Sequence, residues 1–230
     1  MSGHLNKSPL FPRYMRLPLL LVIIFHFSSY LLTKIITDNI AAYDLSTELD
    51  SCIPFSPFFI FFYILAYAQW LFSYIYHFRQ SKESCYQLAT SDLLSKIICA
   101  VCFILIPTTI TRPVITGNGF FESITGIIFS LDTPVNLFPS MHCLMSWLCF
   151  RSSGLINRPS FAYTAVQFIL SILVFASTVL VKQHFFIDII FGIIVAEICW
   201  SLTRHFSLWR IFLRKERSFS LSDEQIKVDE

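Results

Sequence analysis

A histidine and an aspartate four positions apart give this sequence its clearest chemical signal. His184 and Asp188 stand at the start of an apolar segment, and side chains at positions i and i+4 of a helix share one face. The carboxylate can then accept the Nδ1 proton of the imidazole and leave Nε2 free and basic, as in a catalytic triad. Because an unpaired carboxylate this far inside an apolar segment is costly, the pair indicates a working site.

A second polar cluster, Pro139-Ser140-Met141-His142, opens an earlier apolar run. Proline suits the first turn of a helix, and Ser140 can supply a capping oxygen there. The free N–H groups of such a turn, together with the positive end of the helix dipole, form a seat for an anion. His142 would arrive from a different helix than His184 and is available as a proton donor.

Two cations lie at the ends of neighbouring apolar runs. Arg112 can hold phosphate oxygens with its planar fork, and Lys182, two residues before His184, adds a compact positive charge. Two histidines, an orienting acid, two cations and an anion seat together suit phosphoryl transfer through a phosphohistidine.

Each of these residues also has an ordinary structural interpretation. His184 alone can be a hydrogen-bonded residue at a helix start, and Ser140 can be a plain helix cap. Arg112 and Lys182 can each be interfacial anchors. The polar clusters nevertheless all lie at the same predicted face of the membrane, which favours a shared site. The remaining histidines are interpreted as structural or solvated: His26, His77 and His205.

The composition places this chemistry in a membrane. Of the 230 residues, 55% are hydrophobic and only 14% are charged, whereas soluble domains carry about a quarter charged residues. About 20 apolar residues cross a bilayer as a helix. The sequence therefore predicts an all-α polytopic membrane protein with six transmembrane helices, over residues 17–37, 55–77, 91–111, 139–157, 160–181 and 185–204.

The charges between these segments predict the orientation. Lysine and arginine gather before the first segment, after the second and sixth, and between the fourth and fifth, while the other loops are acidic. The positive-inside rule then puts both termini in the cytoplasm and the polar clusters at the extracytoplasmic face. We expect a cytoplasmic segment over 1–16, a transmembrane domain over 17–204, and a partly disordered cytoplasmic tail over 205–230. The net charge of +2 implies no nucleic-acid surface.

An amphipathic helix is expected in the loop before the fourth segment. Six apolar residues recur there at helical spacing: Phe120, Phe121, Ile124, Ile127, Ile128 and Leu131. Such a helix can lie in the outer membrane interface or pack over the bundle.

At the polar clusters the chain resembles the type-2 phosphatidic acid phosphatase superfamily. Its pattern is Lys-x6-Arg-Pro, then Pro-Ser-Gly-His, then Ser-Arg-x5-His-x3-Asp. The chain matches these motifs in order with Arg112-Pro113, Pro139-Ser140-Met141-His142, and Ser177-Thr178 followed by His184 and Asp188. The resemblance covers about residues 90–205.

The resemblance implies a role for each matching residue. His184 would be the nucleophile, Asp188 its orienting acid, and His142 the acid that protonates the leaving oxygen. Ser140 and Arg112 would hold the phosphoryl oxygens. No cofactor or metal is implied.

Two departures from the pattern lower the positive charge of the site. Leu105 stands at the lysine position of the first motif, and Thr178 at the arginine position of the third. Lys182 can restore one charge, whereas Lys96 lies too deep on the inner side. Because a phosphodiester carries less negative charge than a phosphomonoester, fewer cations can favour a diester donor.

The leading hypothesis is a membrane phosphatase that cleaves a lipid phosphate at the outer face. The alternatives are a phosphotransferase that exchanges lipid headgroups, as inositol phosphorylceramide or sphingomyelin synthases do, and a catalytically inactive lipid-binding scaffold. The expected partners are a lipid phosphate and the bilayer, with no nucleic acid and with the oligomeric state open. The membrane would be a plasma or inner membrane, or an endomembrane in a eukaryote.

Overall fold

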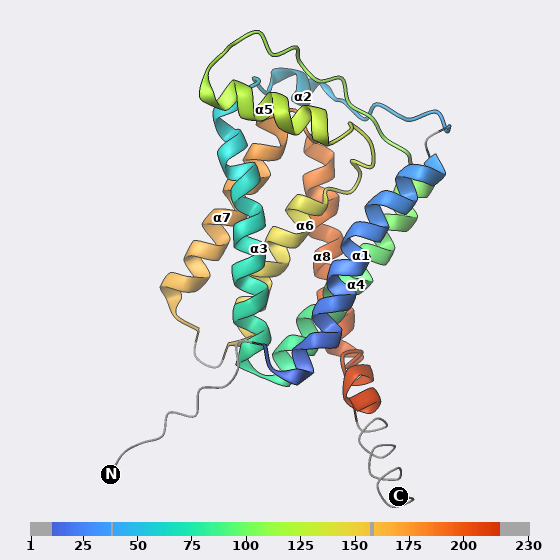
Figure 1. The fold of residues 1–230 in the computed structure, drawn as a ribbon, viewed down its shortest axis with the longest axis vertical. Coiled ribbons are helices and arrows are strands. Elements are labelled where there is room, and N and C mark those ends of the chain that lie inside the picture. Colours follow the sequence, from blue (N-terminus) through green and yellow to red (C-terminus); the bar gives the residue numbers. More distant parts are fainter. Residues whose placement is uncertain (1–10, 38, 157–158, 217–230) are drawn as a thin grey trace, which may run out of the picture.

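The computed structural model describes residues 11–37, 39–156 and 159–216. These residues form a bundle of helices (Figure 1). In chain order the α-helices are α1 (Arg13–Thr37), α2 (Glu48–Cys52), α3 (Ile60–Gln80), α4 (Lys82–Leu105), α5 (Phe120–Leu131), α6 (Met141–Ser152), α7 (Phe161–Leu180) and α8 (Phe186–His205). Single 3₁₀ turns precede α3 at Pro57–Phe59 and follow α6 at Ser153–Leu155. The predicted disordered tail falls largely on residues 217–230, which lie outside the described part.

The all-α membrane architecture is confirmed. Within the described residues, five helical segments are long and apolar enough to cross a bilayer: α1, Pro57–Gln80 at α3, α4, α7 and α8. The fourth predicted crossing corresponds to α6, which has only 12 residues, compared with the roughly 20 that a crossing needs. The number of crossings and the orientation of the chain therefore stay predictions.

The turn between α3 and α4 is shorter than the hydropathy pattern predicted. α3 continues to Gln80 and α4 begins at Lys82, so only Ser81 separates the two helices. The Ser81 side chain accepts a hydrogen bond from the Ser84 N–H at 3.0 Å and starts α4 there. The polar first turns of α4 are buried between neighbouring helices, which is why a hydropathy window starts this helix too late.

α6 is the central helix that the others enclose. It packs against α3, α7 and α8, while α1 packs along α4 on the flank of the bundle. Hydrogen bonds between side chains tie the helices together: the Trp70 Nε1–H donates to Ser146 Oγ at 3.0 Å, and the Gln69 amide donates to Gln167 Oε1 at 3.0 Å. Such bonds replace water where the helices meet inside a bilayer.

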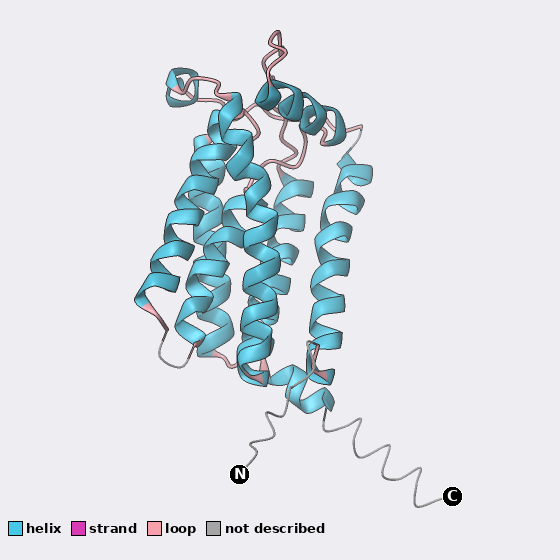
Figure 2. Cartoon of the chain, turned by 60° about the vertical axis from the view of Figure 1, so that its left-hand side comes forward, coloured by secondary structure: helices cyan, strands magenta, loops and turns pink. Residues whose placement is uncertain are grey.

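One end of the bundle carries a cover of short elements. α5 lies across this end, and α2 with its connecting loops lies beside it (Figures 1 and 2). Phe121, Ile124 and Ile128 of α5 pack onto a small core formed by Ile60, Tyr63 and Val181. The predicted amphipathic helix over 120–131 is confirmed, and it packs over the bundle.

We expect the contact between α6 and α8 to tolerate no additional atom at Gly192. A Cβ built there would lie 2.8 Å from the Ser140 carbonyl oxygen and 3.3 Å from the Cys143 Cβ. Gly192→Ala should lower the free energy of unfolding by about 1–3 kcal/mol through overpacking. Thermal unfolding in detergent measures this effect. Gly154→Ala is the matched control, because nothing lies within 4 Å of its added Cβ. Equal melting temperatures for both variants would contradict the prediction.

Candidate active site

His184 and Asp188 form the predicted pair at the start of α8. The His184 Nδ1 lies 3.2 Å from the Asp188 Oδ2, and the same oxygen accepts the Phe185 N–H at 3.0 Å. Asp188 is fully buried. Because Nδ1 is engaged by the carboxylate, Nε2 is the ring nitrogen available to a substrate.

The start of α6 brings His142 to the same place. The ring centroids of His142 and His184 are 6.2 Å apart. The His142 ring stacks on Tyr63 at 4.1 Å between centroids and lies 5.1 Å from Trp70. Its Nε2 is buried and has no hydrogen-bond partner among the described residues. Two histidines from distant parts of the chain therefore meet, as the motif order predicted.

Ser140 joins the two helix starts. Its hydroxyl caps α6 by accepting the Cys143 N–H at 3.4 Å, and its own N–H donates to the Asp188 carbonyl at 3.1 Å. The residue is fully buried. The cap that the sequence predicted is present, and it fixes the start of α6 against the residue that orients His184.

Arg112 reaches the site from the loop after α4. Its guanidinium donates to the carbonyl of Phe129 at 3.2 Å, to the carbonyl of Asp132 and to the Gln183 side chain. Burial lowers the pKa of the Arg112 guanidinium from its ordinary value, and the Asp132 carboxylate opposes that shift. Arg112 lines the same cavity as His184 and is held there by protein acceptors.

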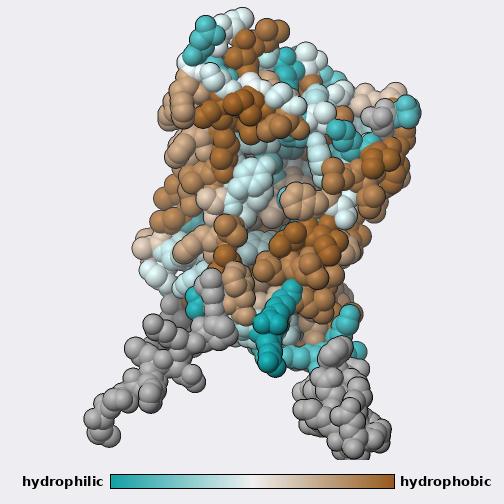
Figure 3. All heavy atoms as spheres, in the orientation of Figure 1, coloured by the Kyte–Doolittle hydropathy of each residue, from teal (hydrophilic) through white to brown (hydrophobic). Residues whose placement is uncertain are grey.

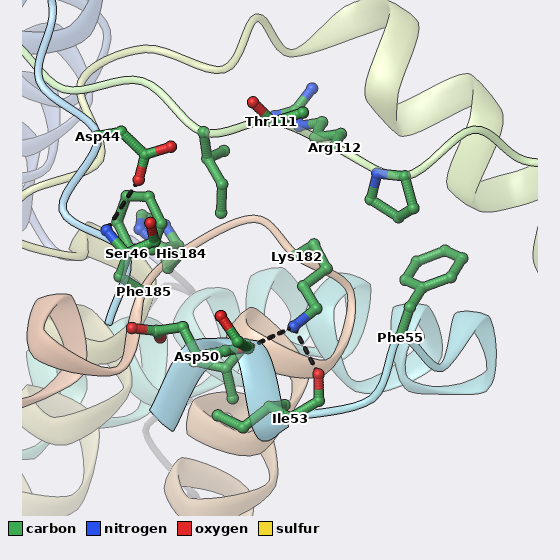
Figure 4. Close-up of a pocket in the computed structure, with 14 residues that line it drawn as sticks. Asp44, Ser46, Asp50, Ile53, Phe55, Thr111, Arg112, Lys182, His184 and Phe185 are labelled. Atoms are coloured by element: carbon green, nitrogen blue, oxygen red, sulfur yellow. Dashed lines mark hydrogen bonds between the residues drawn. The ribbon is translucent and has the colours of Figure 1, made fainter. Parts of the chain in front are cut away.

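Lys182 is engaged differently from the sequence expectation. Its ammonium donates to the carbonyl oxygens of Asp50 at 2.9 Å and Ile53 at 2.6 Å (Figure 4). Two of its three donors thus hold the segment around α2 rather than an anion. The sequence could not show this, because the acceptors are backbone atoms about 130 residues away in the chain.

Asp50 completes a clamp around His184, and sequence reasoning did not find it. One of its carboxylate oxygens accepts the Phe186 N–H at 2.7 Å, and the other accepts the N–H and the hydroxyl of Thr47. The clamp, formed by Asp50 and Lys182, therefore grips the chain two residues before and two residues after His184. The available signal was the spacing Thr47-x-x-Asp50, which is typical of a capping box.

Two cavities meet at His184. The outer cavity has a volume of about 360 Å³ and is lined by Arg112, Lys182, Asp50 and His184 (Figure 4). The inner cavity has a volume of about 720 Å³, and both His142 and His184 line it. A group bound at His184 is therefore accessible from a polar side and from a largely apolar side.

Neither of the two residues that differ from the family pattern, Leu105 and Thr178, supplies a positive charge to the site. Leu105, at the end of α4, is 72% exposed. Thr178 is fully buried, and its carbonyl accepts the N–H groups of Gln183 and His184 at 2.9 and 3.0 Å. Lys96 lies deeper in the bundle, where it pairs with Asp92.

The other histidines separate into two kinds. His77 accepts or donates a hydrogen bond with the Tyr163 hydroxyl at 3.0 Å, and His205 is exposed, so both agree with the structural or solvated interpretation. For His26 this interpretation stays a prediction: its ring lies against Phe27 and Trp70, and it lines the inner cavity together with the catalytic candidates. In the described part of the chain no cluster of three metal-ligating side chains occurs.

Comparison with known proteins shows the family of this chain. The family model of the PAP2 superfamily matches residues 47–202, so this chain belongs to the PAP2 superfamily. A crystal structure of LpxE from Aquifex aeolicus is similar at 19% sequence identity and a TM-score of 0.48, covering 76% of this chain and 93% of that one. The search of curated proteins found no match. The resemblance inferred from the three motifs is thus confirmed.

We expect Asp50→Ala to loosen the clamp. The lost hydrogen bond to the Phe186 N–H is worth about 1–2 kcal/mol, so amide exchange of peptides covering 44–56 and 182–187 should accelerate about tenfold. Hydrogen–deuterium exchange in detergent measures this change. Asp44→Ala is the control, because the hydrogen bond that the Asp44 carboxylate accepts among the described residues comes from the Ser46 N–H in its own loop. Unchanged exchange in the 182–187 peptide of Asp50→Ala would contradict the clamp.

Proposed function

We propose that this protein hydrolyses the phosphate ester of a membrane lipid at the extracytoplasmic face, through a phosphohistidine on His184. Membership of the PAP2 superfamily supports phosphatase chemistry. The observation that carries the proposal is the meeting of His142 with the His184–Asp188 pair, at 6.2 Å between ring centroids.

In the first step the His184 Nε2 attacks phosphorus, and the bond from phosphorus to the lipid oxygen breaks. His142 gives its proton to that leaving oxygen, which departs as a lipid alcohol. Asp188 stabilises the positive charge that develops on the His184 ring. In the second step His142 takes a proton from water, the resulting hydroxide attacks the phosphohistidine, and phosphate leaves with His184 restored.

The two cavities suggest how the substrate lies. Arg112, which lines the outer cavity, would stabilise charge on the phosphoryl oxygens. His142, which lines the inner cavity, would face the lipid oxygen that it protonates. The phosphoryl group would therefore point to the polar side and the lipid alcohol to the apolar side, with His184 between them.

Transfer to an alcohol is a second candidate function. Arg112 and Lys182 are both held by protein oxygens, and neither Leu105 nor Thr178 provides a cation. A site with so little free positive charge suits a phosphodiester donor, which carries one negative charge where a monoester carries nearly two. The chemistry at His184 would be the same, with an alcohol replacing water in the second step.

We expect His184→Ala to lower phosphate release from a lipid phosphate by at least about 10⁴-fold, because replacing even the orienting carboxylate of a catalytic triad costs about that much. Asp188→Asn should cause a comparable loss, because the ring loses its orienting charge. Release of inorganic phosphate in detergent micelles measures both. His205→Ala is the control, since His205 is exposed and ends α8, whereas His184 precedes its start. Undiminished turnover in His184→Ala would eliminate the mechanism.

A labelled substrate separates hydrolysis from transfer. Purified protein incubated with a lipid carrying a ³²P-labelled phosphate should release labelled inorganic phosphate, and the amount should not fall when alcohols are added. Appearance of a new labelled phosphodiester lipid, at the expense of inorganic phosphate, would instead establish the phosphotransferase.

A further inference from the structure

The inner cavity collects buried polar atoms that the rest of the described chain does not satisfy. Five of its lining residues carry such an atom: His26 Nδ1, Tyr74 Oη, Asn136 Oδ1, His142 Nε2 and Gln183 Nε2. Buried polar groups in folded proteins are almost always hydrogen-bonded. Their concentration around one cavity indicates that the cavity receives a ligand with polar groups of its own.

Four of these five atoms lie at two levels. The upper level contains His142 and Gln183 and belongs to the catalytic centre described above. The lower level contains His26 and Tyr74. Along α3, Tyr74 lies 11 residues beyond Tyr63, the ring on which His142 stacks, which corresponds to about 16 Å of helix.

Trp70 connects the two levels. Its ring centroid lies 5.1 Å from that of His142 and 6.3 Å from that of His26. The Trp70 Nε1–H is occupied by Ser146, so the indole offers only an apolar surface between the two histidines. A ligand that leaves His142 along the cavity therefore meets an aromatic wall before it meets His26.

A buried ion pair adds charge to the lower level. Lys96 lines the cavity and pairs with Asp92, and both residues are almost completely buried. Lys96 also donates to the Val22 carbonyl at 3.4 Å, one helical turn from His26. Burying an ion pair inside a membrane bundle is costly, and such residues mark ligand pathways in membrane proteins.

Much of the remaining cavity wall is hydrocarbon. It includes Leu19, Ile23, Phe27, Leu71 and Leu131 from α1, α3 and α5. Because α1 packs along α4, the bundle face between α1 and α3 is hollowed, and Figure 3 shows a paler recess there flanked by hydrophobic side chains. An amphiphile can thus place its chain between α1 and α3 while its polar groups meet the two levels.

We infer that His26, Tyr74 and Lys96 form a second polar binding position, which accepts a hydroxyl or amide group carried on the lipid part of the substrate. This inference rests on the proposed function for the identity of the ligand as a lipid phosphate. A hydroxyl or amide both donates and accepts, which matches an imidazole, a phenol and an ammonium together. A plain hydrocarbon chain leaves His26 Nδ1 and Tyr74 Oη without a partner, and sites built to bind such groups reject analogues that lack them.

The test compares two lipid phosphates of equal chain length, an N-acyl amino-alcohol phosphate and a plain alkyl phosphate. Equilibrium binding to the wild-type protein in detergent micelles, measured with non-hydrolysable phosphonate analogues of the two lipids, should be at least about tenfold tighter for the amide-bearing one. His26→Leu should reduce this ratio to about one by weakening the binding of the amide-bearing lipid. His205→Leu, which alters an exposed histidine, should keep the wild-type ratio.

Tyr74→Phe provides a second variant, since it removes one hydroxyl and keeps the ring that packs in the bundle. It should lower the ratio several-fold in protein that melts at the wild-type temperature. A wild-type ratio of one, or a ratio that survives both His26→Leu and Tyr74→Phe, would overturn the inference.

Phosphate release from the plain alkyl phosphate separates the two proposals. This lipid needs only the catalytic centre, so its hydrolysis tests the proposed function by itself. If neither lipid is hydrolysed but the binding ratio responds to His26→Leu, the proposed function fails and the second polar position stands. If the alkyl phosphate is hydrolysed and the binding ratio is one, the proposed function stands and the second polar position fails.

Discussion

The site depends on one buried carboxylate having to find partners away from water. Asp188 meets this requirement at Oδ2, which accepts hydrogen bonds from the His184 ring and the Phe185 N–H, whereas its Oδ1 has no hydrogen-bond partner among the described residues. Its backbone carbonyl accepts the Ser140 N–H. A single residue therefore orients the candidate nucleophile, starts α8 and anchors α6. The close approach at Gly192 is part of the same arrangement, because only a residue without a side chain lets α8 lie this near the first turn of α6.

The features that the sequence predicted are those set by local spacing. The pairing of His184 with Asp188 and the cap at Ser140 follow from helical geometry, and the amphipathic helix over 120–131 follows from its periodicity. The length of α6 could not be predicted from the sequence, because a hydropathy window cannot distinguish a short helix enclosed by others from one that spans the membrane. The clamp did not follow either, since Lys182 binds backbone oxygens that only the tertiary fold brings near.

The placement of His26 shows the limit of assigning roles by motif. No motif includes it, and a lone histidine in an apolar run has no distinguishing neighbours in sequence. In the fold, His26 lines the cavity between α1 and α3, and His142 and His184 line the same cavity. The division into a polar outer cavity and a mostly apolar inner one also places the scarce positive charge of the site on a single side, at Arg112 and Lys182.

The clamp couples the buried chemistry to an exposed segment of the chain. Leu49, in α2, is 49% exposed, while its neighbour Asp50 holds the first turn of α8. A molecule that binds α2 and displaces it would thus shift the first turn of α8, and with it the imidazole of His184. The position of the candidate nucleophile therefore depends on a segment of the chain that lies outside the helix bundle.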